Sequence, residues 1–267
     1  MALLDVRDLK IAFYDTTPPT EVVKGISFSL EEGETLGIVG ESGSGKTQTA
    51  LSILHLLKEN SAVSGGEILY EDSSVAHASS QDLQRIRGKE ISMIFQEPMT
   101  SLNPVYPVGK QVQEAILLHQ KVSKEEAKQR VIDIFRAVGI PEPEKRYKSY
   151  PHQLSGGLRQ RVMIGMAMVC RPKVMIADEP TTALDVTIEA QILQLMKKLC
   201  EEQETSIILI THNMGVVAEI CDYVYVMYAG RVMEQAETFE LFDHTAHPYT
   251  KGLLKSIPKL DGQEDRL

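Results

Sequence analysis

Cysteine, positive charge and long apolar runs are all scarce in this chain of 267 residues. The three cysteines, Cys170, Cys200 and Cys221, are odd in number and far apart. They therefore argue against a disulfide framework or a zinc site and fit a reducing compartment. The net charge of −9 argues against general affinity for nucleic acid.

No stretch of about 18 or more apolar residues occurs, so we expect no membrane-spanning segment. The first residues lack the basic and apolar regions of a signal peptide. His244 and His247 have no carboxylate or cysteine cluster beside them, and we interpret them as structural. With 43% hydrophobic residues, the chain suits one large domain, or one domain with an inserted subdomain.

One glycine-rich stretch dominates what the sequence does contain. It matches the phosphate-loop pattern G-x-x-x-x-G-K-[ST] in full and consists of Gly40, Glu41, Ser42, Gly43, Ser44, Gly45, Lys46 and Thr47. Strand formers precede it at Thr35–Val39, and a helix start follows from Gln48, which is the context that the motif requires. A chance match in such a chain is on the order of one in a hundred, so we expect nucleotide binding.

The residue types of this loop explain that chemistry. Glycines let successive backbone N–H groups point at one phosphate, and the following helix N-terminus favours an anion. Lys46 can reach the β- and γ-phosphates, and the Thr47 hydroxyl can ligate Mg²⁺.

Polar side chains stand at the ends of three further predicted strands. Lys173–Glu179 reads as a buried parallel strand in which Asp178 is suited to hold Mg²⁺ and Glu179 to orient or deprotonate a water molecule. His212 ends the strand at 206–211. Gln96 ends the strand at 91–95, where ligands bind in open α/β sheets, although a glutamine in this place can also simply cap a loop.

The N-terminal part predicts an antiparallel sheet from strands at 3–13 and 22–30. Phe13 and Tyr14 lie at the end of the first strand, where an aromatic ring can stack on adenine. The alternative, with Phe13 in the core and Tyr14 in solvent, is equally compatible with position alone.

The middle of the chain predicts a helical insertion. Amphipathic helices are expected at 108–118 and 123–138, the second closed by Gly139. Ser155, Gly156 and Gly157 then open another helix, either as an anion-binding N-terminus or as a plain capped helix. The remaining expected elements are a turn at 64–66 followed by a strand to 70, a helix at 79–87 with Ser80 as a cap, a helix at 188–201, a hairpin of strands at 223–228 and 232–234, and a short helix at 247–254.

Together and in this order, these segments resemble an ATP-binding-cassette ATPase subunit over the whole chain. The matching features are the phosphate loop, Gln96, a signature at Leu154–Leu158, the acidic strand end, Asp185 and His212. The resemblance implies an α/β fold, with a RecA-like P-loop core, an N-terminal antiparallel β subdomain and an inserted α-helical subdomain. The implied division is 1–96 with 162–235 for the core, 97–161 for the helical part and 236–267 for a tail.

The resemblance also assigns roles. Two cassettes meet head to tail, so that ATP lies between the phosphate loop of one and the signature residues Leu154, Ser155, Gly156 and Gly157 of the other. Glu179 is then the general base, His212 contacts the γ-phosphate, and Phe13 or Tyr14 stacks on adenine. Thr47, Gln96 and Asp178 hold Mg²⁺, and Asp185 and Gln48 belong to the nucleotide site.

Finer motifs narrow the subfamily. The segments 95–104, 150–157 and 247–250 resemble dipeptide, oligopeptide and nickel importer ATPases. Leu158 replaces the usual glutamine of the signature, as is frequent in this subfamily. Similar subunits usually continue beyond Ile257-Pro258 into a cysteine-bearing extension for an iron–sulfur cluster; this chain stops at Leu267, either as a truncated or as a naturally short member.

We therefore expect an ATPase that powers import of short peptides, with a nickel or metal-chelate importer as the alternative. The expected partners are a second ATPase subunit in a heterodimer (a homodimer in isolation is left open), two membrane permeases and an extracellular substrate-binding protein. The subunit would lie at the cytoplasmic face of the inner membrane. A DNA-repair cassette would need a long heptad insertion that is absent, and a catalytically dead partner would lack Glu179.

The loop at 97–107 is expected to dock on the permease. Its three prolines stiffen it, and Met99, Leu102, Val105 and Tyr106 are expected to be exposed apolar groups. The alternative is that these side chains fold back onto the helical insertion.

Overall fold

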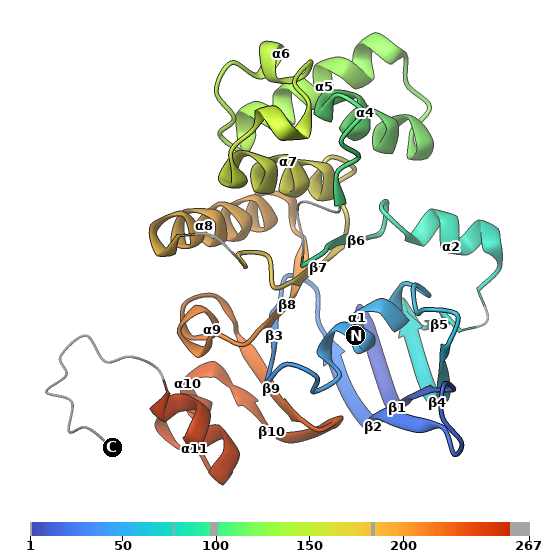
Figure 1. The fold of residues 1–267 in the computed structure, drawn as a ribbon, viewed down its shortest axis with the longest axis vertical. Coiled ribbons are helices and arrows are strands. Elements are labelled where there is room, and N and C mark those ends of the chain that lie inside the picture. Colours follow the sequence, from blue (N-terminus) through green and yellow to red (C-terminus); the bar gives the residue numbers. More distant parts are fainter. Residues whose placement is uncertain (1, 77, 97–100, 183–184, 257–267) are drawn as a thin grey trace, which may run out of the picture.

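Two β-sheets of different kinds flank helix α1 in the computed structural model, which describes residues 2–76, 78–96, 101–182 and 185–256 (Figure 1). The larger sheet has six strands in the order β10-β9-β3-β8-β7-β6, all parallel except for the antiparallel pair β9–β10. Its strands are β3 (Thr35–Val39), β6 (Ile91–Ile94), β7 (Val174–Asp178), β8 (Ser206–Thr211), β9 (Tyr223–Tyr228) and β10 (Arg231–Glu237).

The smaller sheet is antiparallel, with the order β2-β1-β4-β5. Its strands are β1 (Leu4–Phe13), β2 (Thr20–Leu30), β4 (Ser61–Tyr70) and β5 (Ser73–Ser74). This is the N-terminal antiparallel sheet that the alternating pattern predicts.

The other regular elements of the described chain are helices. The helical part at the top of Figure 1 contains α4 (Val108–His119), α5 (Lys124–Ala137), α6 (Pro143–Arg146), the 3-10 turn η1 (Pro151–Gln153) and α7 (Gly156–Met168). The others are α1 (Lys46–Ile53), α2 (Ser80–Ile86), α8 (Val186–Gln203), α9 (Met214–Ile220), α10 (Thr238–Asp243) and α11 (Pro248–Lys255). Among the residues described, none of these helices is both long and apolar enough to cross a membrane.

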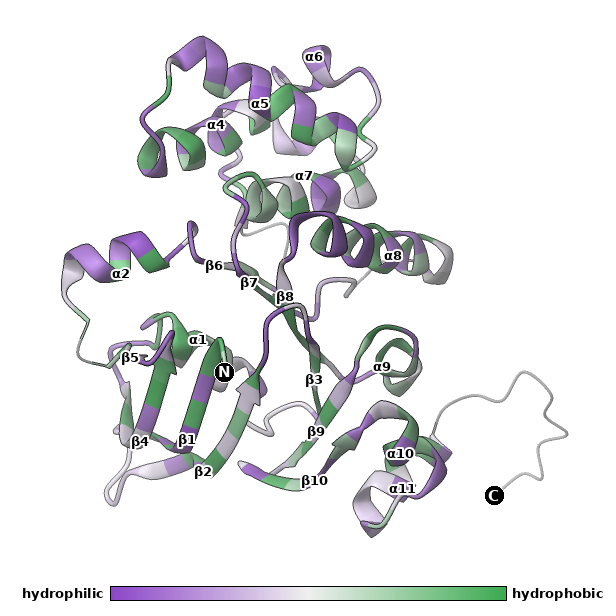
Figure 2. Cartoon of the chain, turned by 180° about the vertical axis from the view of Figure 1, so that it is seen from behind, coloured by the Kyte–Doolittle hydropathy of each residue, from purple (hydrophilic) through white to green (hydrophobic). Residues whose placement is uncertain are grey.

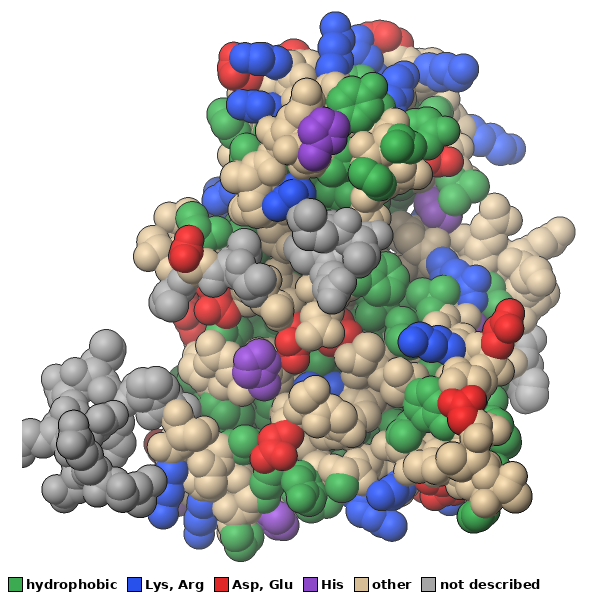
Figure 3. All heavy atoms as spheres, in the orientation of Figure 1, with side chains coloured by type: hydrophobic (Ala, Val, Ile, Leu, Met, Phe, Trp, Pro, Cys, Tyr) green, Lys and Arg blue, Asp and Glu red, His purple; other side chains and the backbone are tan. Residues whose placement is uncertain are grey.

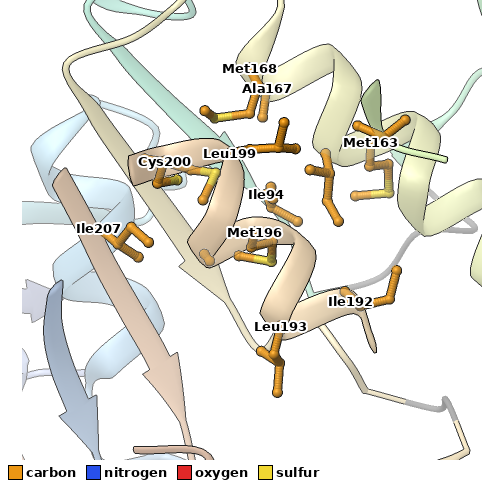
Figure 4. Packing of buried hydrophobic residues seen from close by; sticks show 14 of the residues in the cluster. Ile94, Met163, Ala167, Met168, Ile192, Leu193, Met196, Leu199, Cys200 and Ile207 are labelled. Carbon is orange, nitrogen blue, oxygen red and sulfur yellow. The ribbon is translucent and has the colours of Figure 1, made fainter. Parts of the chain in front are cut away.

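The central strands are buried on both faces, as expected of a parallel sheet covered on each side. Along β7, Val174 and Ile176 pack with α1 and the antiparallel sheet, whereas Met175 and Ala177 pack with α7 and α8. Figure 4 shows the second of these clusters, and Figure 2 shows hydrophobic residues along β3 and β8 and hydrophilic residues over α2 and α6. The expected fold class is therefore confirmed.

Several local predictions need correction. The expected turn at 64–66 is part of β4; Gly66, at φ 84°, accommodates a shift in register against β1, and a Cβ there would lie 2.3 Å from the Asp8 carbonyl oxygen. The cap of α2 is Ser79 rather than Ser80, because the Ser79 hydroxyl accepts the Asp82 N–H at 3.2 Å. Strand β6 ends at Ile94, one residue before the predicted end, and Phe95 is 41% exposed.

Candidate nucleotide site

The phosphate loop joins β3 to α1 and is shaped by its glycines. Gly40 and Gly45 have φ of 151° and 101°, and Gly45 is the N-cap of α1. A Cβ on Gly40 would lie 2.0 Å from the Met227 carbonyl oxygen, and one on Gly45 would lie 2.9 Å from that of Val22. Side chains at these two positions are therefore excluded by the neighbouring backbone of β9 and β2.

Lys46 lies inside the loop and is 5% exposed. Its ammonium donates to the carbonyl oxygens of Gly40 and Glu41 at 2.7 and 2.9 Å. Burial lowers the pKa of Lys46, although the carboxylates of Glu179 and Asp178 act in the opposite direction. The loop thus surrounds the Lys46 ammonium, with which no carboxylate of the described residues forms a salt bridge. This cation is suited to an anionic ligand.

Glu179 connects the ends of three neighbouring strands. Its Oε2 accepts hydrogen bonds from the Gln96 amide at 3.0 Å and the Thr182 hydroxyl at 3.1 Å, and its Oε1 lies 3.2 Å from Nδ1 of His212. Gln96, Glu179 and His212 follow β6, β7 and β8, so parallel pairing places them at one edge of the sheet. Figure 3 shows acidic side chains and a histidine near the middle of this face, below the helical part.

Asp178 is a buried carboxylate beside the loop. It is 2% exposed, and its Oδ1 has no hydrogen-bond partner among the described residues. Burial raises its pKa, while a hydrogen bond from the Thr47 side chain and the charge of Lys46 oppose the rise. No group of three or more His, Cys, Asp or Glu side chains within the described ranges could hold a metal by itself. An oxygen-lined site made by Asp178 and Thr47 suits a hard cation such as Mg²⁺, which usually keeps several waters and phosphate oxygens as ligands.

The structure separates the two aromatic candidates. Phe13 is half-buried and lines a cavity of about 320 Å³ beside the phosphate loop, whereas Tyr14 is 52% exposed and does not line it. The other residues lining this cavity are Val22, Ser42, Gly43, Gly45, Lys46, Thr47, Gln48, Gln96 and Glu179. The expected alternative with Phe13 in the core is therefore not what the structure shows.

The signature residues lie away from this cavity, and none of them lines it. Ser155 is the N-cap of α7, where its hydroxyl accepts the Leu158 N–H at 3.4 Å, and Gly156 and Gly157 form the first turn. The Leu154 side chain is 5% exposed and packs in the helical core, so it is not available to a ligand. Asp185 is the exposed N-cap of α8.

The expected docking loop is only partly exposed. Leu102 is 1% exposed and packs with α4 and α7, so its prediction as a docking residue was wrong, whereas Val105 and Tyr106 are 70% and 57% exposed. Met99 lies outside the described residues. Next to this loop is a largely apolar cavity of about 330 Å³ lined by residues that include Leu56, Phe95 and Met166.

Two contacts at the site were not foreseen. Thr182 could have been noticed from its place just after the acidic strand end. Tyr249, whose hydroxyl accepts the Glu41 N–H at 3.1 Å, comes from α11 more than 200 residues along the chain, and no local pattern reveals that contact.

Comparison with known proteins agrees with these observations. Residues 23–182 match the family described as "ABC transporter", and residues 233–267 match "Oligopeptide/dipeptide transporter, C-terminal region". The chain is 51% identical to the oligopeptide transport ATP-binding protein AppD of Bacillus subtilis, covering 99% of this chain and 81% of the relative. It is 50% identical to OppD of Escherichia coli, covering 100% and 79%, and 50% identical to the dipeptide transport protein DppD of Bacillus subtilis, covering 97% and 78%.

Solved structures show the same architecture. The dimeric ATP-binding cassette MJ0796 bound to ADP and Pi superposes with a TM-score of 0.78 at 26% identity, covering 88% of this chain and 98% of that one. The cassette cbiO1 of Clostridium perfringens, part of the transporter complex cbiONQ, gives 0.77 at 30% identity, covering 91% of each chain.

Proposed function

Because this chain belongs to the ABC transporter family, as an ATP-binding subunit of the oligopeptide and dipeptide importers, we propose that its site hydrolyses ATP with Glu179 as the general base. Hydrolysis coupled to transport is the activity of the family. The residues that carry this activity are the subject of the proposal.

The observation that carries the proposal is the set of three contacts around the Glu179 carboxylate, from Gln96, Thr182 and His212. A water molecule between this carboxylate and the phosphate loop would attack the γ-phosphorus, and the bond from phosphorus to the ADP oxygen would break. Glu179 would receive the proton that the water loses. With one of its ring nitrogens near Glu179 and its side chain 67% exposed, His212 is free to contact the γ-phosphate with the other.

The remaining loop residues bind the nucleotide. Backbone N–H groups of the loop and the N-terminus of α1 surround the phosphates, Lys46 neutralises their charge, and Phe13 stacks on adenine. Thr47, Asp178 and Gln96 would hold Mg²⁺, and the buried free Oδ1 of Asp178 supports this assignment. When bound, the cation would neutralise charge on the phosphate oxygens.

The signature residues act on the ATP of a second subunit. Ser155 is exposed and Gly156 and Gly157 are half-buried at the start of α7, and the cavity beside this chain's own phosphate loop does not include them. The dimeric cassette MJ0796 provides a precedent for pairing. We propose a head-to-tail pair, in the working transporter a heterodimer with a similar ATPase. Residues 1–96 and 162–235 would serve as the nucleotide-binding core, 97–161 as the signature subdomain and 236–267 as the tail.

The proposed membrane partners are two permeases, with an extracellular binding protein that delivers peptide, and the subunit would lie on the cytoplasmic side of the inner membrane. The exposed Val105 and Tyr106, with Phe95 beside the apolar cavity, form the surface that would receive a permease. Phe95 directly precedes Gln96 in the chain, so a change at Glu179 has a short path to this surface.

The test is transport in proteoliposomes that contain this subunit, its partner ATPase, both permeases and the binding protein. We expect ATP-dependent uptake of a labelled dipeptide or oligopeptide, and loss of uptake with Glu179→Gln. Uptake of a nickel chelate but of no peptide would replace the peptide proposal with its alternative.

A further inference from the structure

The outer side of the phosphate loop is in contact with the C-terminal helix α11. The Glu41 N–H donates to the Tyr249 hydroxyl at 3.1 Å, and the Glu41 carbonyl oxygen accepts from Lys46 at 2.9 Å. Tyr249 therefore holds the peptide unit before Glu41 from outside the loop. Lys46, the lysine proposed to bind phosphate, holds the peptide unit after Glu41 from inside the loop.

Tyr249 is itself held firmly in place. Its ring lies against that of Tyr228, at the end of β9, with 4.7 Å between the ring centroids. Its backbone N–H donates to Nδ1 of His247, the N-cap of α11. The Glu234 carboxylate on β10 accepts the N–H groups of Ala246 at 2.6 Å and His247 at 3.2 Å. The helix is thus anchored to the β9–β10 hairpin, which also touches the loop through a hydrogen bond from the Gly230 N–H to the Ser44 carbonyl oxygen at 3.1 Å.

The chemistry of a phenol suits this position. Burial raises the pKa of Tyr249, so its hydroxyl is neutral at physiological pH. A neutral acceptor can hold a backbone N–H beside a phosphate site without repelling the phosphates, whereas a carboxylate in its place would repel them.

We propose that Tyr249 is a positioning residue of the phosphate loop, through which the C-terminal helix holds the loop in its ATP-binding shape. Tyr249 does not line the cavity beside the loop; its hydroxyl fixes the peptide unit before Glu41 and so lowers the cost of ordering the loop when ATP binds. This inference rests on the assignment of the phosphate loop as the ATP site.

The test compares Tyr249→Phe with Tyr228→Phe in the full chain. Both changes keep the contact between the two rings and remove one hydroxyl, but only the first removes the contact with Glu41. Loss of one such hydrogen bond is expected to weaken ATP binding about 2- to 10-fold. We expect the KM for ATP to rise in parallel with kcat unchanged at saturating ATP, because Glu179 is untouched. The unfolding temperature without nucleotide should fall by no more than about 5 °C, and Tyr228→Phe should bind ATP like the unmodified chain.

Other outcomes would overturn the inference. Unchanged ATP affinity in Tyr249→Phe would show that the contact does not position the loop. Equal weakening in both variants would assign the effect to the ring pair, and a fall in kcat alone would place Tyr249 in a later step. Lys46→Ala tests the ATP site separately from the role of Tyr249. This variant should keep its fold and lose ATP binding. Normal ATP binding by Lys46→Ala would overturn the assignment of the phosphate loop as the ATP site.

Discussion

The side-chain amide of Gln96 donates a hydrogen bond of 3.0 Å to the carboxylate of Glu179, and thereby joins the ends of two adjacent parallel strands. This hydrogen bond orients the carboxylate that is proposed as the general base. Gln96 lies next to the exposed Phe95. A change at Glu179 on hydrolysis is thus one residue away from the surface proposed to contact the permease.

Replacing Glu179 by glutamine should stop hydrolysis and spare binding. The substitution keeps size and hydrogen bonding but removes the proton acceptor, so turnover should fall by about 100-fold or more. ATP affinity should be retained, and the ATP-bound pair should accumulate. The measurement is steady-state ATPase activity with the partner subunit present, together with ATP binding.

Glu189→Gln is a matched control for this experiment. Glu189 lies beside Glu179 around one cavity, but its carboxylate accepts from Thr181 rather than from the three groups at Glu179. The ATPase activity of Glu189→Gln should stay close to that of the unmodified chain. Normal hydrolysis in Glu179→Gln would assign the base to another residue.

Phe13→Ala should weaken ATP binding much more than Tyr14→Ala. Base stacking on an aromatic ring contributes about 1–3 kcal/mol by alanine substitution, so the dissociation constant should rise about 5- to 150-fold. The adjacent Tyr14, which does not line the cavity, serves as the control. GTP should be affected to a similar degree, because stacking does not read the edge of a base. A larger loss with Tyr14→Ala would reverse the assignment.

Asp178→Asn should stabilise the nucleotide-free protein and abolish its response to Mg²⁺. Burial is the main reason that the pKa of Asp178 lies above its ordinary value of 3.8, so the folded chain binds the proton more tightly than the unfolded chain. The free energy of unfolding therefore falls as pH rises from 3.8 through the folded pKa, and the full penalty is present above the folded pKa. Asparagine removes that penalty.

Thermal unfolding at several pH values measures this effect. Each kcal/mol gained should raise the unfolding temperature by about 2–4 °C, with a larger gain at neutral pH than in acid. The extra stabilisation that Mg²⁺ gives to the ATP-bound protein should disappear. Asp72→Asn is the same change in the exposed turn between β4 and β5. It should alter neither the unfolding temperature nor the stabilisation by Mg²⁺. A lower stability of Asp178→Asn at pH 7 would contradict the prediction.

Serine at both Val105 and Tyr106 should impair assembly without harming the ATPase. Both side chains are exposed, so unfolding temperature and basal hydrolysis of the ATPase pair should be nearly unchanged. Association with the permeases and peptide uptake should fall sharply. Full transport by this variant would refute docking at these residues.

Leu102→Ser is the contrasting variant. Its side chain is buried in the helical core, and truncation of a buried leucine costs about 2–5 kcal/mol. We therefore expect a loss of stability and, with it, of basal hydrolysis. Testing Leu102→Ser separately distinguishes a loss of core packing from a loss of permease docking. A joint change of Leu102 and Tyr106 would combine the two effects.

The amino-acid pattern was sufficient to predict the segments whose structure is local. The glycines of the phosphate loop, the apolar strands before Lys46 and Glu179, and the cap at Ser155 depend on backbone conformation and on neighbours within a few residues, so their patterns predicted them. The order of these segments was sufficient to indicate the family and the fold class. It also placed Gln96, Glu179 and His212 at strand ends, and hence at one edge of the sheet.

Contacts between residues far apart in the sequence became visible only in the folded chain. Leu102 lies in the core whereas Tyr106 is exposed, and Phe13 rather than Tyr14 lies beside the phosphate loop. The two residues of each comparison are close in sequence and similar in polarity, so the sequence does not distinguish them. The folded chain also brings Tyr249 to Glu41. Such contacts are fixed by the packing of helices and hairpins against one another, and the free energy that selects them comes from surfaces that the local sequence does not contain.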